Sequence, residues 1–253
     1  MSSTMNGVGK LACPERNYFF YGKLMDADQF QKDQFYFNHK RSLVNRLVLG
    51  SGLVCGLSIV QDTEAGGMLR IEPGLAIDGS GREIVVSAPV LVDPRQLTND
   101  QGEPEGTPID AGFVEIRLAY AETKADLVPV LVPDCDTYGN CAPSTIREGF
   151  RVLVRQTTDE IPRPPGCNFP LQSPPAEAPP RELLQLLLCE RTREKCSELP
   201  TDASVPLGRV RIENEAISSI DPCVGRQLVY SNALLYELIL CLAERVQALS
   251  SGT

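Results

Sequence analysis

The side chains best suited to chemistry in this sequence are nine cysteines and one histidine. Both residue types are common zinc ligands, and structural zinc sites usually separate paired cysteines by two to four residues. The most closely spaced cysteines are Cys135 with Cys141 and Cys189 with Cys196, six and seven positions apart, and His39 is distant from both pairs in sequence. This spacing favours loop thiols or a local disulfide, with a structural zinc as the alternative.

The cysteine count also indicates a reducing compartment. An odd number of cysteines without a secretory signal favours reduced thiols. Residues 1–7 have neither the charged region nor the apolar region of such a signal. We therefore expect a cytoplasmic protein. Because Cys55 and Cys241 lie in apolar runs, we expect both to be small core residues.

Catalytic patterns are absent from the sequence. A Ser-His or Cys-His nucleophile would have to use His39, which lies in the middle of a predicted helix, and no nucleotide-binding, zinc-protease or hydrolase motif occurs. Asp134, Asp136 and Asn140 resemble the start of a calcium loop but lack its closing glutamate. Carboxylates are abundant, although no pair has the aromatic surroundings of a sugar-cleaving site. We predict no catalytic, metal-binding or cofactor-binding residue.

The net charge and the hydropathy argue against two other classes of protein, nucleic-acid-binding proteins and proteins with a membrane-spanning helix. A net charge of -9 argues against nucleic-acid binding, which needs clustered lysine and arginine to contact phosphates. No run of about 18 apolar residues is present, so no membrane-spanning helix is expected. Hydrophobic residues make up 42% and charged residues 23% of the chain, as in a globular protein.

Residues 1–50 are predicted to form an aromatic docking segment followed by a long helix. Asp26 and Gln29 have the capping-box pattern, and neither proline nor glycine follows until Gly50 supplies a stop. This predicts a helix of about 22 residues, with an apolar stripe formed by Phe30, Phe37, Val44 and Val48. The expected anchoring residues are Tyr18, Phe19, Phe20, Tyr21, Phe30 and Phe37. They contact either a partner or the core of their own chain.

Residues 51–225 are predicted to form a β-rich body. Short apolar runs separated by glycines occupy residues 53–60, 68–72, 75–77 and 83–86. Asp78 to Gly81 has the chemistry of a hairpin turn. Apolar residues then alternate with polar ones along 113–120 and, more briefly, at Phe150, Val152, Val154, Val210 and Ile212. A proline-rich and partly helical insertion is expected at about residues 155–204.

Residues 226–253 are predicted to form a C-terminal helix with heptad spacing. The seam consists of Leu228, Asn232, Leu235, Ile239, Leu242, Val246 and Leu249. Two alternatives stay open, because the flanking positions are too apolar for an isolated dimer: packing on the chain's own domain, or association with a second helix. The predicted fold class is α+β, mainly β, with an antiparallel β-sandwich or barrel flanked by the two helices.

Several blocks of the sequence together resemble a known family. They are residues 17–25 with 38–41, residues 50–57, residues 72–86, and the shorter fragments 147–150 and 230–235. This series resembles a poorly characterised bacterial family found among the proteins of phage-tail-like contractile injection systems. The P-G-x-A-x-D-x-x-G-R-E-I pattern from Pro73 to Ile84 is also similar to β domains of phage baseplate and tail-fibre proteins.

The resemblance implies a non-enzymatic structural subunit of such a particle, in its baseplate, a fibre or an associated tail component. Its partners would be other subunits of the particle and further copies of the chain, and no catalytic residue is implied. The particle would lie in the cytoplasm, attach to a membrane or be released. Two alternatives remain: a monomeric β-rich module that binds surface glycan, and a zinc-stabilised regulatory protein.

Overall fold

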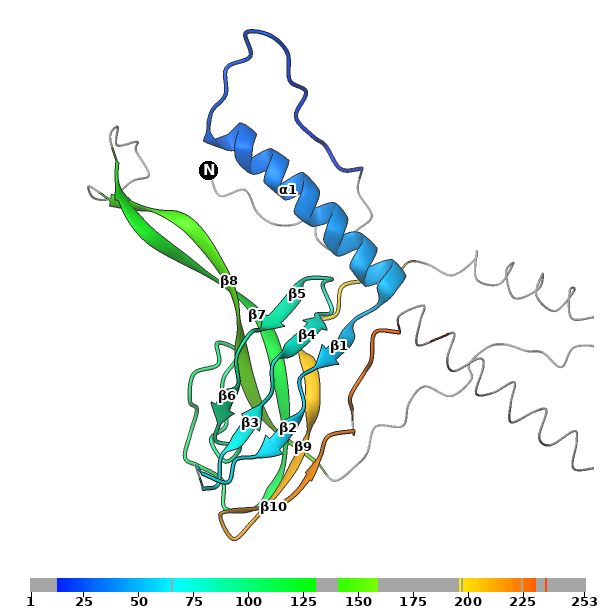
Figure 1. Ribbon diagram of the computed structural model, residues 1–253, viewed down its shortest axis with the longest axis vertical. Coiled ribbons are helices and arrows are strands. Elements are labelled where there is room, and N and C mark those ends of the chain that lie inside the picture. Colours follow the sequence, from blue (N-terminus) through cyan, green and yellow to red (C-terminus); the bar gives the residue numbers. More distant parts are fainter. Residues whose placement is uncertain are drawn as a thin grey trace, which may run out of the picture.

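The computed structural model describes residues 13–64, 66–130, 141–158, 196, 198–223, 225–230 and 235. These residues form three antiparallel sheets and one N-terminal helical element, which projects from the sheets (Figure 1). A mainly β fold with a long N-terminal helix is therefore confirmed. The sandwich or barrel and the C-terminal helix stay predictions.

The N-terminal helix begins and ends where the sequence predicts. Helix α1 spans Ala27–Val44 and continues without a break into a π-helical turn, η1, over Asn45–Leu49. The Asp26 carboxylate accepts a hydrogen bond from the Gln29 backbone N–H at 3.0 Å, which satisfies one of the free donors of the first turn. Gly50 ends the helix at φ 83°, a conformation that glycine adopts without strain.

Two small sheets follow the helix. The first has the strand order β1-β4-β5 and the second has the order β2-β3-β6. Their strands are β1 Gly52–Gly56, β2 Ile59–Gln61, β3 Leu69–Ile71, β4 Gly74–Ile77, β5 Glu83–Val86 and β6 Val90–Val92. The apolar run of residues 53–60 is thus divided between two sheets, because Leu57 adopts φ 57° and turns the chain.

The third sheet has the order β10-β9-β7-β8. Its strands are β7 Gly112–Pro129, β8 Cys141–Thr157, β9 Val205–Glu213 and β10 Ala216–Asp221. Strands β7 and β8 pair along their whole length, from Phe113 with Thr157 to Pro129 with Cys141, and they extend well beyond the other strands (Figure 1). The sequence indicated only the inner halves of this long hairpin.

The hydrophobic core lies between the small sheets and the four-stranded sheet. Val114, Ile116 and Leu118 of β7 are fully buried, which confirms the alternation read from residues 113–120. They belong to one core cluster with buried residues of all three sheets and of the turn at Leu57, namely Leu53, Leu57, Ile59, Leu69, Ile71, Ala76, Ile84, Val86, Val154, Val205, Leu207, Val210 and Ile212. Because the core is continuous across all three sheets, the body folds as one unit.

The expectation that Cys55 is a core residue is wrong. The pairing of β1 with β4 shifts register between Leu53 and Cys55, so the strict alternation of inward and outward side chains ends there. Leu53 stays buried, and Cys55 is exposed. Cys241, the other cysteine expected in the core, lies outside the described residues.

The chain returns to the edge of β1 before it enters the C-terminal region. Leu53 N–H donates to the Gln227 carbonyl at 2.7 Å, and Val229 N–H donates to the Leu53 carbonyl at 2.8 Å. Gly52 permits this approach, because it adopts φ 141° and an added Cβ would lie 2.3 Å from the Gln227 carbonyl oxygen. Of the predicted C-terminal helix, only Leu235 is described beyond residue 230, and it is helical.

Candidate interaction surface on the N-terminal arm

Residues 13–49, which we call the N-terminal arm, carry most of the aromatic residues predicted as anchors. Residues 13–26 arch beside the first half of α1 (Figure 1), and Asn17 holds them there. Its side-chain amide donates to the Gln29 carbonyl, its backbone N–H donates to Asp33 Oδ1 at 3.3 Å, and Lys23 Nζ donates to its Oδ1 at 3.1 Å. These bonds give the segment a defined path along the helix.

The aromatic side chains between these contacts point into solvent. Tyr18 is 79% exposed, Phe19 57%, Phe20 60% and Tyr21 106%. Rings of Tyr18 and Phe20 stack at 6.4 Å, and Lys23 lies 5.5 Å from the Phe19 ring centre. These contacts stay within the segment, so the four aromatic residues cover little of the chain's own apolar surface.

The apolar stripe of helix α1 is also exposed to solvent. Phe30 is 60% exposed and Phe37 68% exposed, and α1 contains no buried residue. Val44 and Val48 are also exposed. Contiguous exposed apolar surface of this kind marks sites of protein contact. These residues therefore lie outside the core of the described part of the chain, and their contact with a partner stays a prediction.

The arm is joined to the body at one tightly built position. Asn45 is buried, and its side-chain amide donates to the Gly81 carbonyl at 3.0 Å and to Glu83 Oε1 at 2.8 Å. Arg41 adds an ion pair with Glu83 at 3.2 Å. Gly81 has φ 86°, and an added Cβ would lie 2.0 Å from the Ser42 carbonyl oxygen. The end of the helix therefore rests directly on the turn between β4 and β5.

That turn is organised by the carboxylate of Asp78. Asp78 is fully buried and accepts hydrogen bonds from the backbone N–H groups of Ser80 and Arg82, both at 2.8 Å. The Arg82 guanidinium pairs with it at 2.7 Å and stacks on the Tyr120 ring at 4.5 Å. The predicted hairpin is thus confirmed, and its charged residues hold the platform on which the helix rests.

The C-terminal anchoring residues are only partly described. Leu228 forms a bridge with Leu53 and is 45% exposed, and Leu235 is 42% exposed. The remaining seam residues lie outside the described part of the chain: Asn232, Ile239, Leu242, Val246 and Leu249. Whether the seam joins chains or packs within one chain stays a prediction.

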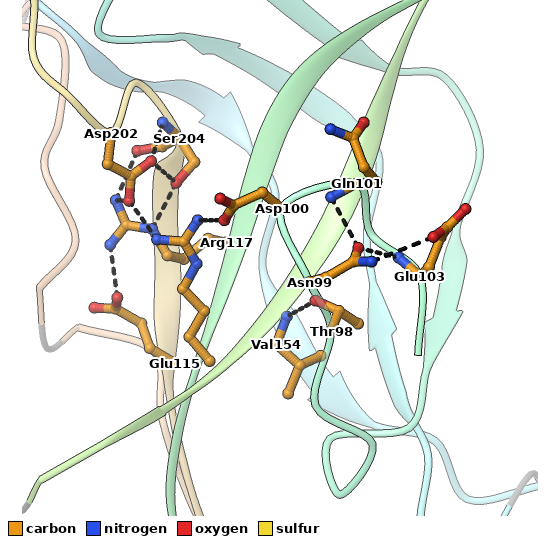
Figure 2. Close-up of polar contacts among 11 residues, drawn as sticks. Thr98, Asn99, Asp100, Gln101, Glu103, Glu115, Arg117, Val154, Asp202 and Ser204 are labelled. Atoms are coloured by element: carbon orange, nitrogen blue, oxygen red, sulfur yellow. Dashed lines mark hydrogen bonds and ion pairs between the residues drawn. The ribbon is translucent and has the colours of Figure 1, made fainter. Parts of the chain in front are cut away.

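A cluster of charged and polar residues lies on the four-stranded sheet and the loops beside it (Figure 2). Arg117 contacts Glu115 at 2.6 Å and donates to the Ser204 hydroxyl at 2.7 Å. Arg155, from the adjacent strand, bridges Asp202 and Asp100, each at 2.8 Å. Each of these carboxylates is paired with an arginine, as expected for a cluster that fastens loops to the sheet.

The pKa of Asp202 agrees with a structural role for this cluster. Burial disfavours the ionised form of Asp202, but hydrogen bonds from Ser204 and the charges of Arg117 and Arg155 outweigh it and lower the pKa of Asp202 below its ordinary value. Asp202 is therefore held as a carboxylate. A general acid would need a raised pKa.

An open depression of about 430 Å³ lies beside the cluster. It is lined by residues 97–100, Glu105 and residues 154–156. Its floor is closed by a reciprocal pair of hydrogen bonds, in which Val154 N–H donates to the Thr98 hydroxyl at 2.9 Å and Thr98 N–H donates to the Val154 carbonyl at 3.0 Å. These contacts fasten the loop to the edge of β8.

The described residues form neither a metal-binding group nor a membrane-spanning helix. No three of their histidine, cysteine, aspartate or glutamate side chains are grouped to hold a metal. Cys141 and Cys196 are exposed free thiols, while Cys135 and Cys189 lie outside the described part of the chain. Within the described ranges, no helix is long and apolar enough to cross a membrane.

Comparison with known proteins finds likeness only in structure. No protein-family model and no curated protein matches the chain. The cryo-electron microscopy structure of the type VI secretion system TssK-TssF-TssG baseplate subcomplex matches with 15% identity and a TM-score of 0.45, covering 94% of this chain and 72% of that chain. The crystal structure of TssK matches with 12% identity and a TM-score of 0.35, covering 83% of this chain and 41% of that chain.

Sequence reasoning missed the residues that position the arm. Asn17 and Asn45 each make two side-chain hydrogen bonds that fix a segment of the arm. Asn45 is a polar residue within an apolar run, which is the signal that could have identified it; Asn17, next to Glu15 and Arg16, carries no such signal. Leu24 and Phe35 were also not named as anchors, although they are 85% and 55% exposed.

Proposed function

We propose that this protein is a non-enzymatic structural subunit of a phage-tail-like contractile injection system, in its baseplate, a fibre or an associated tail component. The proposal rests on the resemblance of residues 17–25, 50–57 and 72–86 to that family. The observation that carries it is the exposed aromatic segment, which we define as Tyr18, Phe19, Phe20, Tyr21 and Leu24.

The physical reason is the cost of leaving such residues in water. Burying one large apolar side chain stabilises a contact by about 1.5–3 kcal/mol before ordering costs. The aromatic segment places five such side chains together, and Asn17 and Lys23 hold its backbone before a partner arrives. A preordered segment loses less entropy on binding than a free one. Docking to another subunit of the particle is the function that uses this arrangement.

Two of the blocks that carry the resemblance, residues 50–57 and 72–86, lie where the arm joins the body. Gly52 lets the chain end pass beside β1, and Gly81 lets the helix rest on the β4–β5 turn. Asp78, Arg82 and Glu83 hold that turn and the helix end together. We infer that the family pattern preserves a rigid joint between arm and body, as a subunit that transmits contacts requires.

We propose that the protein catalyses no reaction. The carboxylates around Arg117 and Arg155 are engaged in ion pairs, and His39 stacks on Phe35 at 5.7 Å on the outside of α1. These residues are placed to support structure. The glycan-binding and zinc-stabilised alternatives gain no specific support from the described contacts.

The experiment is co-sedimentation with assembled particles from the native cell. A variant carrying Tyr18→Ser, Phe19→Ser and Tyr21→Ser should fall at least tenfold in the particle fraction, because its docking surface is removed. The matched control carries Val85→Ser and Leu91→Ser, which replace apolar residues that are 61% and 49% exposed on the body. This control should sediment with particles as the unaltered chain does.

Two results would contradict the proposal. One is the absence of the unaltered protein from any tubular particle in its host, observed by electron microscopy of particles with and without the gene. The other is a triple variant that sediments with particles at the unaltered level.

A further inference from the structure

Strands β7 and β8 leave the body as a two-stranded ribbon, and among the described residues the β7 edge of this ribbon is unpaired. The last residue of β7 that pairs with β9 is Leu118, opposite Val205, whereas its pairing with β8 continues to Pro129. From Ala119 onwards, β7 therefore has a described neighbour on one side only (Figure 1). Such an edge presents backbone N–H and C=O groups to which a further strand can bond.

The unpaired edge of β7 is regular over residues 119–125. Each residue in this stretch lies opposite a residue of β8 in one unbroken register, and none of them is proline or glycine. The stretch ends at Asp126, which adopts φ 57° and accepts a hydrogen bond from the Ser144 hydroxyl at 2.7 Å. Residues 119–125 are therefore a straight template for strand addition.

The opposite edge of the ribbon, along β8, is blocked at two places. Pro143 has no backbone N–H to donate. Further along the strand, Val154 N–H donates to the Thr98 hydroxyl, and the Val154 carbonyl accepts from Thr98 N–H. A proline and a covering loop are ordinary means of closing a sheet edge. The β7 edge has neither among the described residues, so it is the better site for a further strand.

The bonds of Val154 also show which backbone groups of β7 are free. Because they run to Thr98, they point away from β7, and Ile116, which lies opposite Val154, must direct its own backbone groups away from β8. The register stays unbroken from Ile116 to Ala125, so this direction alternates residue by residue. The backbone groups that face the unpaired edge therefore belong to Tyr120, Glu122 and Lys124.

The side chains along this edge carry complementary charges. Glu122 and Lys124 are exposed and lie two positions apart, on one face of the ribbon. Glu148 of β8 lies directly opposite Glu122, and no described lysine or arginine pairs with either carboxylate. Like charges at directly opposite positions are destabilising. A cation placed beside Glu122 from a further strand would relieve this repulsion.

We propose that two copies of the chain pair antiparallel along residues 121–125 of β7, about a two-fold axis at Thr123. In this register Glu122 of each copy lies opposite Lys124 of the other, and the two Thr123 residues lie opposite each other. The result is one continuous sheet in the order β8-β7-β7-β8. This surface is separate from the aromatic segment, so the inference goes beyond the proposed function and does not depend on it.

The charges and the backbone groups both favour this register. An axis at Glu122 or at Lys124 would set like charges opposite each other, and an axis at Ala121 would place Lys124 opposite Leu118, where β9 already occupies the edge. The axis at Thr123 pairs opposite charges twice. It also lets Glu122 and Lys124 exchange their free backbone hydrogen bonds, which makes the surface self-complementary, as a two-fold interface must be.

The test is a charge exchange in the full chain, measured by sedimentation velocity over a range of concentrations, because so short a contact is weak. Glu122→Lys and Lys124→Glu should each weaken self-association at least about tenfold, since each sets like charges opposite at two places. An equimolar mixture of these two variants should associate as the unaltered chain does. The control is Glu64→Lys, an equal change of charge at an exposed turn, which should leave association unchanged.

A double variant tests the register itself. Glu122→Lys combined with Lys124→Glu should self-associate like the unaltered chain but form no mixed pairs with it, as native mass spectrometry of isotope-labelled chains can show. Hydrogen exchange at positions 120, 122 and 124 should slow as the protein concentration rises. Positions 121 and 123, whose amides face β8, should not change. Protection of the amides of residues 114–118 reports that the body is intact in each variant.

Three results would overturn the inference. A chain that stays monomeric up to its solubility limit, with slow exchange at positions 120, 122 and 124, would assign the edge to another segment of the same chain. A monomer with fast exchange at these positions would leave the edge without a second copy. Self-association that is equal in all the variants would assign it to another surface. None of these results alters the co-sedimentation test of the aromatic segment.

Discussion

The β body and the N-terminal arm both carry large apolar side chains, but the body buries them and the arm exposes them. In the body, Ile116 and Leu118 are 0% exposed, whereas in the arm Phe37 is 68% and Tyr21 106% exposed. The body uses its apolar residues to fold, and its core is complete without the arm. The apolar residues of the arm are absent from the core of the described residues, and this difference is the reason for proposing that the arm contacts other subunits.

At the joint between the two regions, a polar residue of the arm is buried. Asn45 is among the few buried polar residues, and both of its side-chain hydrogen bonds reach across to the β4–β5 turn. A buried amide with its partners in place specifies one geometry, because any other leaves polar groups unsatisfied. The arm is therefore exposed along its length and fixed in direction at its base.

The largest expected effect comes from breaking the body. Leu118→Ala removes a fully buried side chain from the centre of β7 and should lower the free energy of unfolding by about 2–5 kcal/mol, measured by urea denaturation. Tyr21→Ala, in the arm, should change it by less than about 0.5 kcal/mol. Similar losses in the two variants would show that the arm belongs to the folding core.

The next effect comes from breaking the joint. Gly81→Ala forces a side chain to φ 86° and within 2.0 Å of the Ser42 carbonyl oxygen, which costs about 1–3 kcal/mol in backbone strain alone. Hydrogen exchange should show lost protection in residues 41–49, with β7 and β9 unchanged. Gly66→Ala is the control, because nothing lies within 4 Å of its added Cβ. Unchanged protection after Gly81→Ala would contradict the proposed joint.

The strands of the body could be predicted because burial of one face produces a regular alternation of apolar and polar residues in the sequence. Val114, Ile116 and Leu118 alternate on a strand with one buried face, and Asp26 and Gly50 mark the helix ends through local hydrogen bonding and backbone conformation. Such features depend on neighbours in sequence. They could be read without knowing the tertiary structure.

The arrangement at the joint could not be predicted, because it depends on contacts between distant residues. Asn45 and Gly81 are 36 positions apart, and no local pattern pairs them. Cys55 was misplaced for a related reason, since a register shift against β4 overrides the alternation of its own strand. The candidate surface was predicted from residue type, but that its aromatic residues lie outside the described core could be seen only in the structure.

A smaller effect is expected when the aromatic segment is released from the helix. Asn17→Ala removes the hydrogen bonds of its side chain with the Gln29 carbonyl and with Lys23, each contributing about 0.5–1.5 kcal/mol. The body should keep its urea midpoint, while amides of residues 15–24 should exchange faster. Gln31→Ala, on an exposed face of α1, is the control. Unchanged exchange in that segment would show that Asn17 does not hold it.

The smallest effect concerns acid and tests the ion pairs that close the body. The folded state lowers the pKa of Asp202 below its ordinary value, so this carboxylate stabilises the fold above the ordinary pKa and the contribution is lost as the pH falls through the folded pKa. Asp202→Asn should therefore reduce the difference between urea midpoints at pH 6 and pH 3, whereas Asp28→Asn, on the arm, should leave the difference as it was. Because Asp202 is 37% exposed, solvent screens its ion pairs and the change should be the smallest of the four. An equal change in both variants would mean that low pH destabilises the protein through the arm as much as through the body. The ion pairs of Asp202 would then not distinguish the two regions.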